Sequence, residues 1–141
     1  PPRYKYAGSD QIEEVSWYEG NSGGKTQPVG RKAPNELGIF DMSGNVNEWC
    51  HDWLGDYTSS NKTNPIGPVV GTVRALRGGS YGHSATRSRV AYRSSSTPDY
   101  RWVRIGFRIA KTVIPYESMD KTPPTAGIPE INLSATTTTR R

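Results

Sequence analysis

Turn-forming residues divide this chain into short pieces, and no other feature limits its possible folds as strongly. The 141 residues include 15 glycines and 11 prolines, a share that disfavours helical bundles and coiled coils. The segment 11–18 predicts one short helix, with Ser9 or Asp10 as its N-cap. The segment 43–53 predicts turns or a second short helix.

Three further segments predict strands, at 69–77, 88–93 and 103–111. The last of them alternates apolar residues with arginine and small residues, so that its apolar side chains would share one face. Those apolar residues are Val103, Ile105, Phe107 and Ile109. Together the pieces fit an antiparallel, loop-rich α+β domain.

The composition changes near residue 112. All four Trp, both Phe and seven of the eight Tyr precede it, which is enough large apolar surface to build a core. We therefore expect a folded domain at 1–111, followed by a Pro/Thr-rich extended tail at 112–141. No apolar run approaches the roughly 18 residues that a membrane span needs.

The chain contains a single cysteine, Cys50, which excludes an internal disulfide and any dithiol chemistry within it. With only His51 and His83 as histidines, no Cys/His ligand set for zinc is available. Cys50 is predicted to be a small buried hydrophobe rather than a reactive thiol.

Two carboxylates flank a glycine in the segment 35–53. Asp41 and Glu48 are seven residues apart, and Gly44 lets the backbone between them curl so that carbonyl oxygens can point inward. Calcium prefers such a mixture of carboxylate and carbonyl oxygens. The alternative from the residues alone is that Asp41 caps a turn and Glu48 lies in solvent. Trp49 and Trp53 are predicted to be core anchors on one helical face.

Arginine dominates the segment 74–108, which holds eight arginines against one acidic residue, Asp99. Guanidinium groups suit bidentate contacts with carboxylates and stacking on aromatic rings. Two interpretations remain open. The first, in which arginines pair with carboxylates and backbone carbonyls of the core, fits best for Arg77, Arg93 and Arg108. The second, in which arginines contact a ligand, fits best for Arg87, Arg89, Arg101 and Arg104.

Several motifs occur in one order along the chain: NELGIFDMSGNVNEW at 35–49, RGGSY at 77–81, AYRSSSTPD at 91–99 and IGFRIA at 105–110. This order resembles the C-terminal half of the formylglycine-generating enzyme (sulfatase-modifying factor) family, bacterial members included, over about residues 3–111. The resemblance implies a low-regularity α+β domain related to C-type lectins and lacking its N-terminal half. We expect a missing N-terminal portion or another chain to complete it.

The resemblance also implies a structural calcium ion. Its ligands would be the side chains of Asp41 and Glu48 and the backbone carbonyls of Gly44 and Val46. The ion would cross-link a loop that has few backbone hydrogen bonds of its own.

Enzymes of the family bind copper through two cysteines that follow the GGS motif and oxidise a substrate cysteine to formylglycine. Residues 81–91 of this chain contain no cysteine, and Ser88 stands about where many bacterial relatives have one. Copper(I) favours thiolate ligands, which a serine hydroxyl cannot replace. The resemblance therefore favours the fold and disfavours both copper and the oxidase reaction.

The favoured interpretation is a catalytically silent family member that binds a protein, peptide or glycan, including a possible retroelement-diversified variable protein. Its ligand surface mixes aromatic residues with arginine, as interaction hot spots do. The candidate residues are Tyr81, His83, Arg87, Arg89, Tyr92, Tyr100, Arg101, Trp102 and Arg104. The alternatives are a sulfatase-maturing oxidase whose catalytic cysteines are missing or replaced, and a nucleic-acid-binding protein. The resemblance favours a location outside the cytoplasm.

Overall fold

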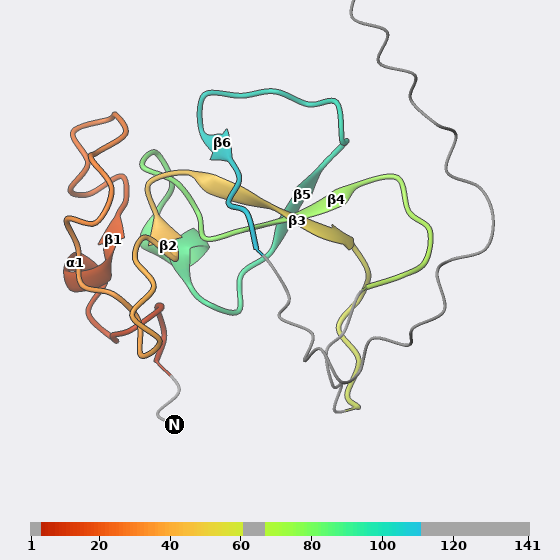
Figure 1. Cartoon of the computed structure of the whole chain (residues 1–141), viewed down its shortest axis with the longest axis horizontal. Helices are drawn as coiled ribbons and strands as arrows, with labels where there is room; N and C mark the ends of the chain where they lie inside the picture. The colour runs from red at the N-terminus through yellow and green to blue at the C-terminus, as the bar shows by residue number, and fades with distance from the viewer. Residues whose placement is uncertain (1–3, 61–66, 111–141) are drawn as a thin grey trace, which may run out of the picture. The chain divides into compact units, whose positions relative to one another are not determined.

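The structure, a computed structural model, describes residues 4–60 and 67–110 (Figure 1). Residues 1–109 group into one compact unit, and all helices and strands given below belong to it. The predicted tail at 112–141 lies outside the described residues.

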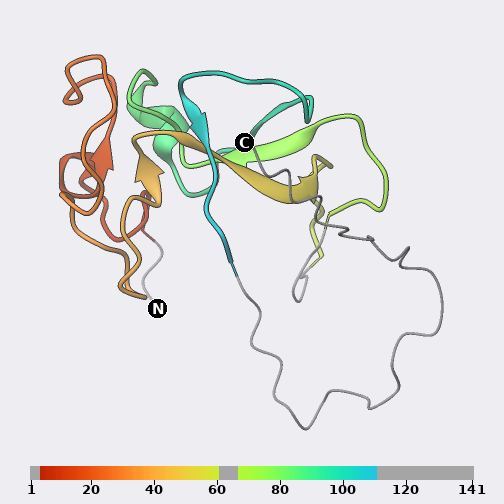
Figure 2. The same ribbon diagram turned by 45° about the horizontal axis from the view of Figure 1, so that its top comes forward.

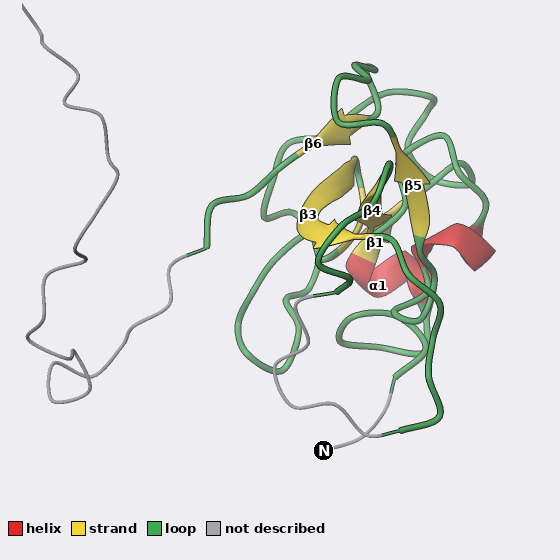
Figure 3. Ribbon diagram, turned by 90° about the vertical axis from the view of Figure 1, so that its right-hand side faces the viewer, coloured by secondary structure: helices red, strands yellow, loops and turns green. Residues whose placement is uncertain are grey.

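Regular elements are few and short, and loops make up most of the described chain (Figure 3). This confirms the prediction of an α+β domain of low regularity, in which strands outnumber helices. In chain order the elements are α1 (Ile12–Val15), β1 (Ser16–Trp17), β2 (Ser43–Gly44), β3 (Asn47–Trp53), β4 (Arg74–Arg77), the 3₁₀ helix η1 (Ala85–Ser88), β5 (Ser94–Ser96) and β6 (Ile105–Gly106).

The strands β1 and β2 form a small parallel pair beside α1 (Figure 1), in which Ser16 lies opposite Ser43 and Trp17 opposite Gly44. Gly44 has a φ of 81°. A Cβ atom there would collide with the side chain of Ser16 and the backbone of Trp17. Only glycine lets the two strands approach this closely.

The other four strands form one sheet in the order β5-β4-β3-β6 (Figure 2). The central pair β3–β4 is antiparallel and sets Glu48 opposite Arg77, with an irregularity between Trp49 and Trp53. The edge strand β6 runs parallel to β3, with Gly106 opposite Glu48. The sheet therefore brings the segment around Glu48 next to the end of the arginine-rich segment.

The buried apolar core of the described residues is small. Tyr6, Ile12 and Val15 form one cluster, against which Tyr18 and Ala85 pack. The remaining buried apolar side chains are Ala75, Leu76 and Tyr81. So small a core buries little apolar surface, and polar cross-links have a correspondingly larger part in holding the segments together.

Both helix predictions need correction. The helix predicted at 11–18 is limited to the four residues of α1, and its N-cap is Gln11 rather than Ser9 or Asp10. Ser9 Oγ instead accepts a hydrogen bond from the N–H of Gln11. The segment 43–53 forms β2 and β3, so Trp49 and Trp53 are half-buried residues of a strand and share no helical face. Pairing with β4 decides the outcome there.

The strand predictions are right in type at two places and wrong in extent. Of 69–77 only β4 is a strand, and 88–93 contains no strand, because Ser88 ends η1 and 89–93 precedes β5. The alternation at 103–111 yields only β6, and Val103, Phe107 and Ile109 are 74%, 75% and 90% exposed. Their apolar face has no covering layer among the described residues, so alternation alone does not extend the strand.

None of the helices in the described ranges has the length and apolar character to cross a bilayer.

Candidate functional site

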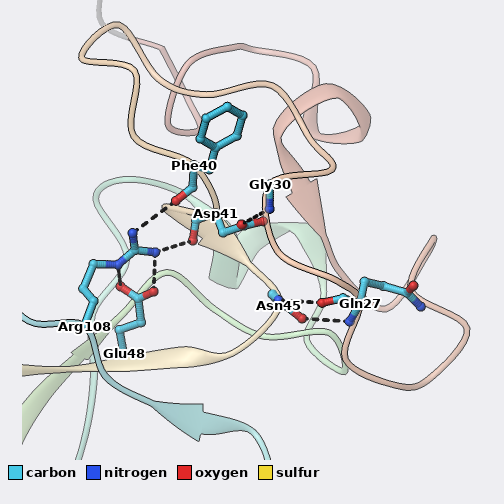
Figure 4. A network of polar contacts seen from close by, with 7 residues as sticks. All are labelled: Gln27, Gly30, Phe40, Asp41, Asn45, Glu48 and Arg108. Atoms are coloured by element: carbon cyan, nitrogen blue, oxygen red, sulfur yellow. Dashed lines mark hydrogen bonds and ion pairs between the residues drawn. The ribbon is translucent and has the colours of Figure 1, made fainter.

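The guanidinium group of Arg108 joins two distant parts of the chain (Figure 4). It donates to both carboxylate oxygens of Glu48, from Nε at 2.8 Å and from Nη2 at 2.5 Å. It also donates to the backbone carbonyls of Phe40 and Asp41, each at 3.1 Å. The bond with Glu48 raises the pKa of Arg108. We call these four residues the Arg108 clamp.

A second set of hydrogen bonds attaches residues 41–45, which include Asp41 of the Arg108 clamp, to residues 27–30 (Figure 4). The carboxylate of Asp41 accepts the N–H of Gly30 at 2.7 Å. The side-chain amide of Asn45 accepts the N–H of Gln27 at 3.0 Å and donates to its carbonyl at 3.1 Å. Asp41 and Asn45 have positive φ angles of 57° and 61°, in the left-handed region that Asp and Asn adopt more readily than other residues that carry a side chain.

The carboxylates of both predicted calcium ligands, Asp41 and Glu48, already have hydrogen-bond partners in this structure. The carboxylate of Glu48 faces Arg108, whereas that of Asp41 faces Gly30 (Figure 4). Gly44 is in β2 and Val46 directly precedes β3. No group of three or more His, Cys, Asp or Glu residues gathers within 4–60 and 67–110. Calcium binding by Asp41, Gly44, Val46 and Glu48 therefore stays a prediction.

Two more arginines bind backbone carbonyls. Arg77 donates to the carbonyls of Tyr92 at 3.0 Å and Val90 at 2.6 Å. Arg93 donates to the carbonyl of Gly55 at 2.6 Å. These contacts, with the Arg108 clamp, confirm the interpretation in which Arg77, Arg93 and Arg108 hold the domain together. We call these three the tied arginines.

Six of the nine predicted ligand residues form a continuous chain of contacts. The guanidinium of Arg104 lies 5.1 Å from the ring centre of Tyr81 and 5.0 Å from that of Trp102. The ring of Trp102 lies 6.3 Å from that of His83. His83 Nε2 is 3.5 Å from Arg87 Nη1, and Arg87 lies 6.0 Å from the ring centre of Tyr92. We call Tyr81, His83, Arg87, Tyr92, Trp102 and Arg104 the aromatic–arginine cluster.

Backbone geometry fixes the centre of this cluster. Arg104 donates to the carbonyl of Gly82 at 3.3 Å, and its guanidinium lies where a Cβ atom of residue 82 would be. A side chain at 82 would therefore displace Arg104 from between its two rings. Sequence reasoning did not single out Gly82, and no local pattern marks it, because the contact depends on a residue 22 positions later.

The cluster has a buried floor and an exposed rim. Tyr81 is 8% exposed, whereas Trp102 is 42% exposed. Arg87 is exposed beside them, as are the neighbouring Tyr100 and Arg101. Aromatic groups that are partly buried and partly accessible, flanked by arginine, are typical of interaction hot spots.

His83 lies between positive charges within the cluster. Burial lowers its pKa, and the nearby guanidinium groups of Arg87 and Arg104 lower it further. Its Nδ1 is buried without a hydrogen-bond partner among the described residues. A neutral imidazole is thus favoured at neutral pH, and adding a proton would place three positive charges side by side.

Arg89 lies outside the aromatic–arginine cluster that six of the other predicted ligand residues form. Its side chain lines a pocket with residues from 4–8 and 35–42, and no residue of the aromatic–arginine cluster lines that pocket. Sequence reasoning missed the pocket because its walls come from three segments far apart in the chain. No local motif connects these segments.

Ser88, which stands where many relatives have a cysteine, and Cys50, the single thiol of the chain, are both poorly placed to react with a substrate. Ser88 is 1% exposed, and its hydroxyl has no partner within the described ranges. Cys50 is half-buried on β3, where burial raises its pKa. A raised pKa leaves less of the nucleophilic thiolate at neutral pH.

Comparison with known families matches residues 2–113 to the model of the sulfatase-modifying factor enzyme 1-like domain. The formylglycine-generating enzyme of Streptomyces coelicolor is 46% identical over 90 residues, which cover 60% of this chain and 29% of that protein. The chaperone protein LppX of Paenibacillus barcinonensis is 35% identical over 106 residues, 63% of this chain and 35% of that protein. This chain thus spans about a third, or less, of these curated relatives.

Among solved structures, Treponema denticola variable protein 1 superposes with a TM-score of 0.70 at 38% identity. The match covers 74% of this chain and 39% of that one. The α+β fold predicted from the motifs is therefore shared with a solved structure.

Proposed function

Because the chain belongs to the sulfatase-modifying factor enzyme 1-like family, we propose that it is a member that binds a ligand and does not oxidise cysteine. The observation that carries the proposal is the aromatic–arginine cluster. Arg104 lies between two rings, one of them buried and the other accessible. Such a preorganised arrangement loses little side-chain entropy on binding, which favours recognition of a protein, peptide or glycan.

The lack of a cysteine pair supports a catalytically silent member. Residues 81–91 contain no cysteine. The one thiol of the chain, Cys50, is on β3, and its raised pKa does not suit a nucleophile or a copper ligand. The similarity to Treponema denticola variable protein 1 supports the narrower proposal that residues of this surface vary among relatives.

Peptide and glycan arrays probed with labelled protein test the proposal. We expect a subset of array elements to bind wild type and to lose binding to Trp102→Ala and Arg104→Gln. Lys25→Gln removes an exposed positive charge that lies outside the aromatic–arginine cluster. This variant is the matched control and should keep binding. Equal binding of all three variants and wild type would place recognition elsewhere.

A turnover assay tests the silent character directly. The protein is incubated with copper, oxygen and a cysteine-bearing sulfatase peptide, and the peptide mass is followed. We expect the peptide to remain unchanged. Conversion of its cysteine to formylglycine would make the chain an oxidase.

We propose a structural calcium ion as a separate part of this function. Positive φ angles at Asp41, Gly44 and Asn45 give the loop a curl that suits calcium ligands. The ion would have to share Glu48 with Arg108 and draw Asp41 away from Gly30. Thermal melts of wild type and Asp41→Asn in calcium or in chelator test it: wild type alone should lose stability on chelation, and an indifferent wild type would rule the ion out.

Exposed apolar side chains support the prediction that another part of the polypeptide, or another chain, covers this domain. Leu37 and Val103 are 80% and 74% exposed, and Phe107 and Ile109 are comparably open. Apolar groups exposed together are typical of interaction surfaces. Size-exclusion chromatography of residues 1–141 should show self-association or binding to a supplied relative's N-terminal portion, and a monodisperse monomer that binds neither would contradict the prediction.

A further inference from the structure

A pocket of about 430 Å³ lies apart from the aromatic–arginine cluster. Three segments supply its walls, one near the N-terminus, one preceding β2 and one that runs from the end of β4 to the two residues after η1. The lining residues are Tyr4, Tyr6, Ala7, Gly8, Asn35, Glu36, Met42, Arg77, Gly78, Arg89 and Val90. Its volume falls in the range of roughly 300–1,000 Å³ that is typical of small-molecule sites.

Hydrogen bonds between the segments hold the pocket in shape. The N–H of Val90 donates to the carbonyl of Lys5 at 3.0 Å. The N–H of Ala7 donates to Ser43 Oγ at 3.1 Å, and that hydroxyl donates to the carbonyl of Ser88 at 3.1 Å. All three segments are therefore connected before any ligand arrives, which limits the ordering cost of binding.

The lining is mostly apolar. Tyr4, Tyr6, Met42 and Val90 supply aromatic and aliphatic surface. Gly78, with a φ of 87°, adds open backbone where a side chain would narrow the space. Such a lining favours a ligand with an apolar or aromatic body.

Three charged residues line the pocket, and they are not equivalent. Arg77 already donates to the carbonyls of Tyr92 and Val90. Arg89 is exposed and its side chain makes no hydrogen bond among the described residues, so its guanidinium has donors for a carboxylate. Glu36 is also exposed and has no ion pair with a described residue. Its negative charge opposes a second carboxylate on the ligand.

We propose that this pocket binds a small monocarboxylate with an apolar or aromatic body, held through its carboxylate by Arg89. The site is independent of the surface assigned to the larger ligand, because the two share no residue. Glu36 makes the pocket selective for one negative charge over two.

Binding of 3-phenylpropionate, followed by amide chemical shifts, tests the proposal. We expect saturable binding in the millimolar range or tighter that shifts the amides of Ala7, Gly8 and Gly78 and leaves those of the aromatic–arginine cluster in place. The uncharged 3-phenylpropanol should bind about tenfold more weakly, the usual size for losing a hydrogen-bonded charge. Shifts confined to the cluster, or equal affinity for the alcohol, would overturn the proposal.

Variants separate the roles of the charges. Arg89→Gln should weaken 3-phenylpropionate binding about tenfold, whereas Arg31→Gln, an exposed arginine outside the pocket, should leave it unchanged. Glu36→Gln should strengthen binding of the dianion phenylsuccinate and leave the monoanion nearly unaffected. Arg89→Lys, which keeps the charge, should bind with intermediate affinity if Arg89→Gln proves unstable. Wild-type affinity in both Arg89 variants would contradict the assignment.

Discussion

Arg77, Arg93 and Arg108 donate to backbone carbonyls of other segments at 2.6–3.1 Å, although Arg93 also lies 3.8 Å from the ring centre of Tyr57. Arg87 donates to no carbonyl of the described residues, and Arg104 makes one longer contact, of 3.3 Å to Gly82, beside the rings of Tyr81 and Trp102. The tied arginines connect loops that regular structure does not connect. The arginines of the aromatic–arginine cluster leave donors and ring faces accessible. Because the apolar core is small, the hydrogen bonds of the tied arginines replace part of the apolar packing. The arginines of the aromatic–arginine cluster remain available for a ligand.

The largest expected effect separates the two groups by stability. Arg108→Met removes the bonds to Glu48, Phe40 and Asp41 and leaves those acceptors without the guanidinium. Because the Arg108 side chain is 39% exposed, water replaces part of the loss, and we expect about 2 kcal/mol of destabilisation. Urea unfolding measures it.

Arg101→Gln is the matched control for that prediction. Arg101 is exposed and its side chain makes no hydrogen bond among the described residues. Its substitution should change the free energy of unfolding by less than about 0.5 kcal/mol. Equal destabilisation by the two substitutions would remove the distinction between the groups.

The next effect concerns binding. Gly82→Ala places a methyl group where the guanidinium of Arg104 lies and should displace it from between Tyr81 and Trp102. Affinity for any ligand found on the arrays should fall about tenfold, the typical cost of losing one interface anchor. Gly23→Ala, where nothing lies within 4 Å of the new Cβ, serves as the comparison, and similar losses in both would contradict the role of Arg104.

A smaller effect is expected from pH. The pKa of His83 is lowered from its ordinary value of 6.5 by burial and by its arginine neighbours. Below about pH 6.5 the imidazole of His83 binds more protons in the unfolded chain than in the folded one. The free energy of unfolding therefore keeps its full value above about pH 6.5 and decreases as the pH falls. His83→Gln should flatten this part of the profile of unfolding free energy against pH. If His83→Gln leaves the slope of unfolding free energy against pH unchanged, another titratable group is responsible.

The smallest expected effect concerns Cys50, whose thiol belongs to neither group. Burial raises its pKa, so native protein should react with iodoacetamide more slowly than protein unfolded in urea. Mass spectrometry follows the modification. Equal rates in the two states would show that burial does not protect the thiol.

The sequence predicted the class of fold and the cross-linking contacts of Arg77, Arg93 and Arg108, whereas the ligand contacts expected for Arg87, Arg89, Arg101 and Arg104 stay a prediction. Glycine and proline content disfavoured long elements, and the loop-rich α+β domain followed. The expectation of antiparallel pairing is wrong for β1–β2 and β3–β6, which are parallel. The two interpretations of the arginines followed from chemistry, since a guanidinium can bind either a carbonyl or a ring.

The remainder depended on contacts that no local pattern encodes. A spacing of four residues between Trp49 and Trp53 fits both a helix face and a strand, and the pairing of Trp49 with Leu76 on β4 decides for the strand. The separation of Arg89 from Arg87 depends on the N-terminal segment that meets Val90. The alternation at 103–111 predicted a long strand, but strand length depends on a partner and a covering layer.

Nitrogen-15 spectra of the arginine side chains test most directly whether the tied arginines differ from the arginines of the aromatic–arginine cluster. Rotation of a guanidinium group is hindered when its N–H groups are held by fixed acceptors. Arg77, Arg93 and Arg108 should therefore show separate Nη signals and slow hydrogen exchange, whereas Arg87 of the aromatic–arginine cluster should show averaged signals and fast exchange. Arg101, an exposed arginine outside both groups, should behave like Arg87. Averaged signals for all of them would contradict the account, because the carbonyl contacts would then hold nothing in place.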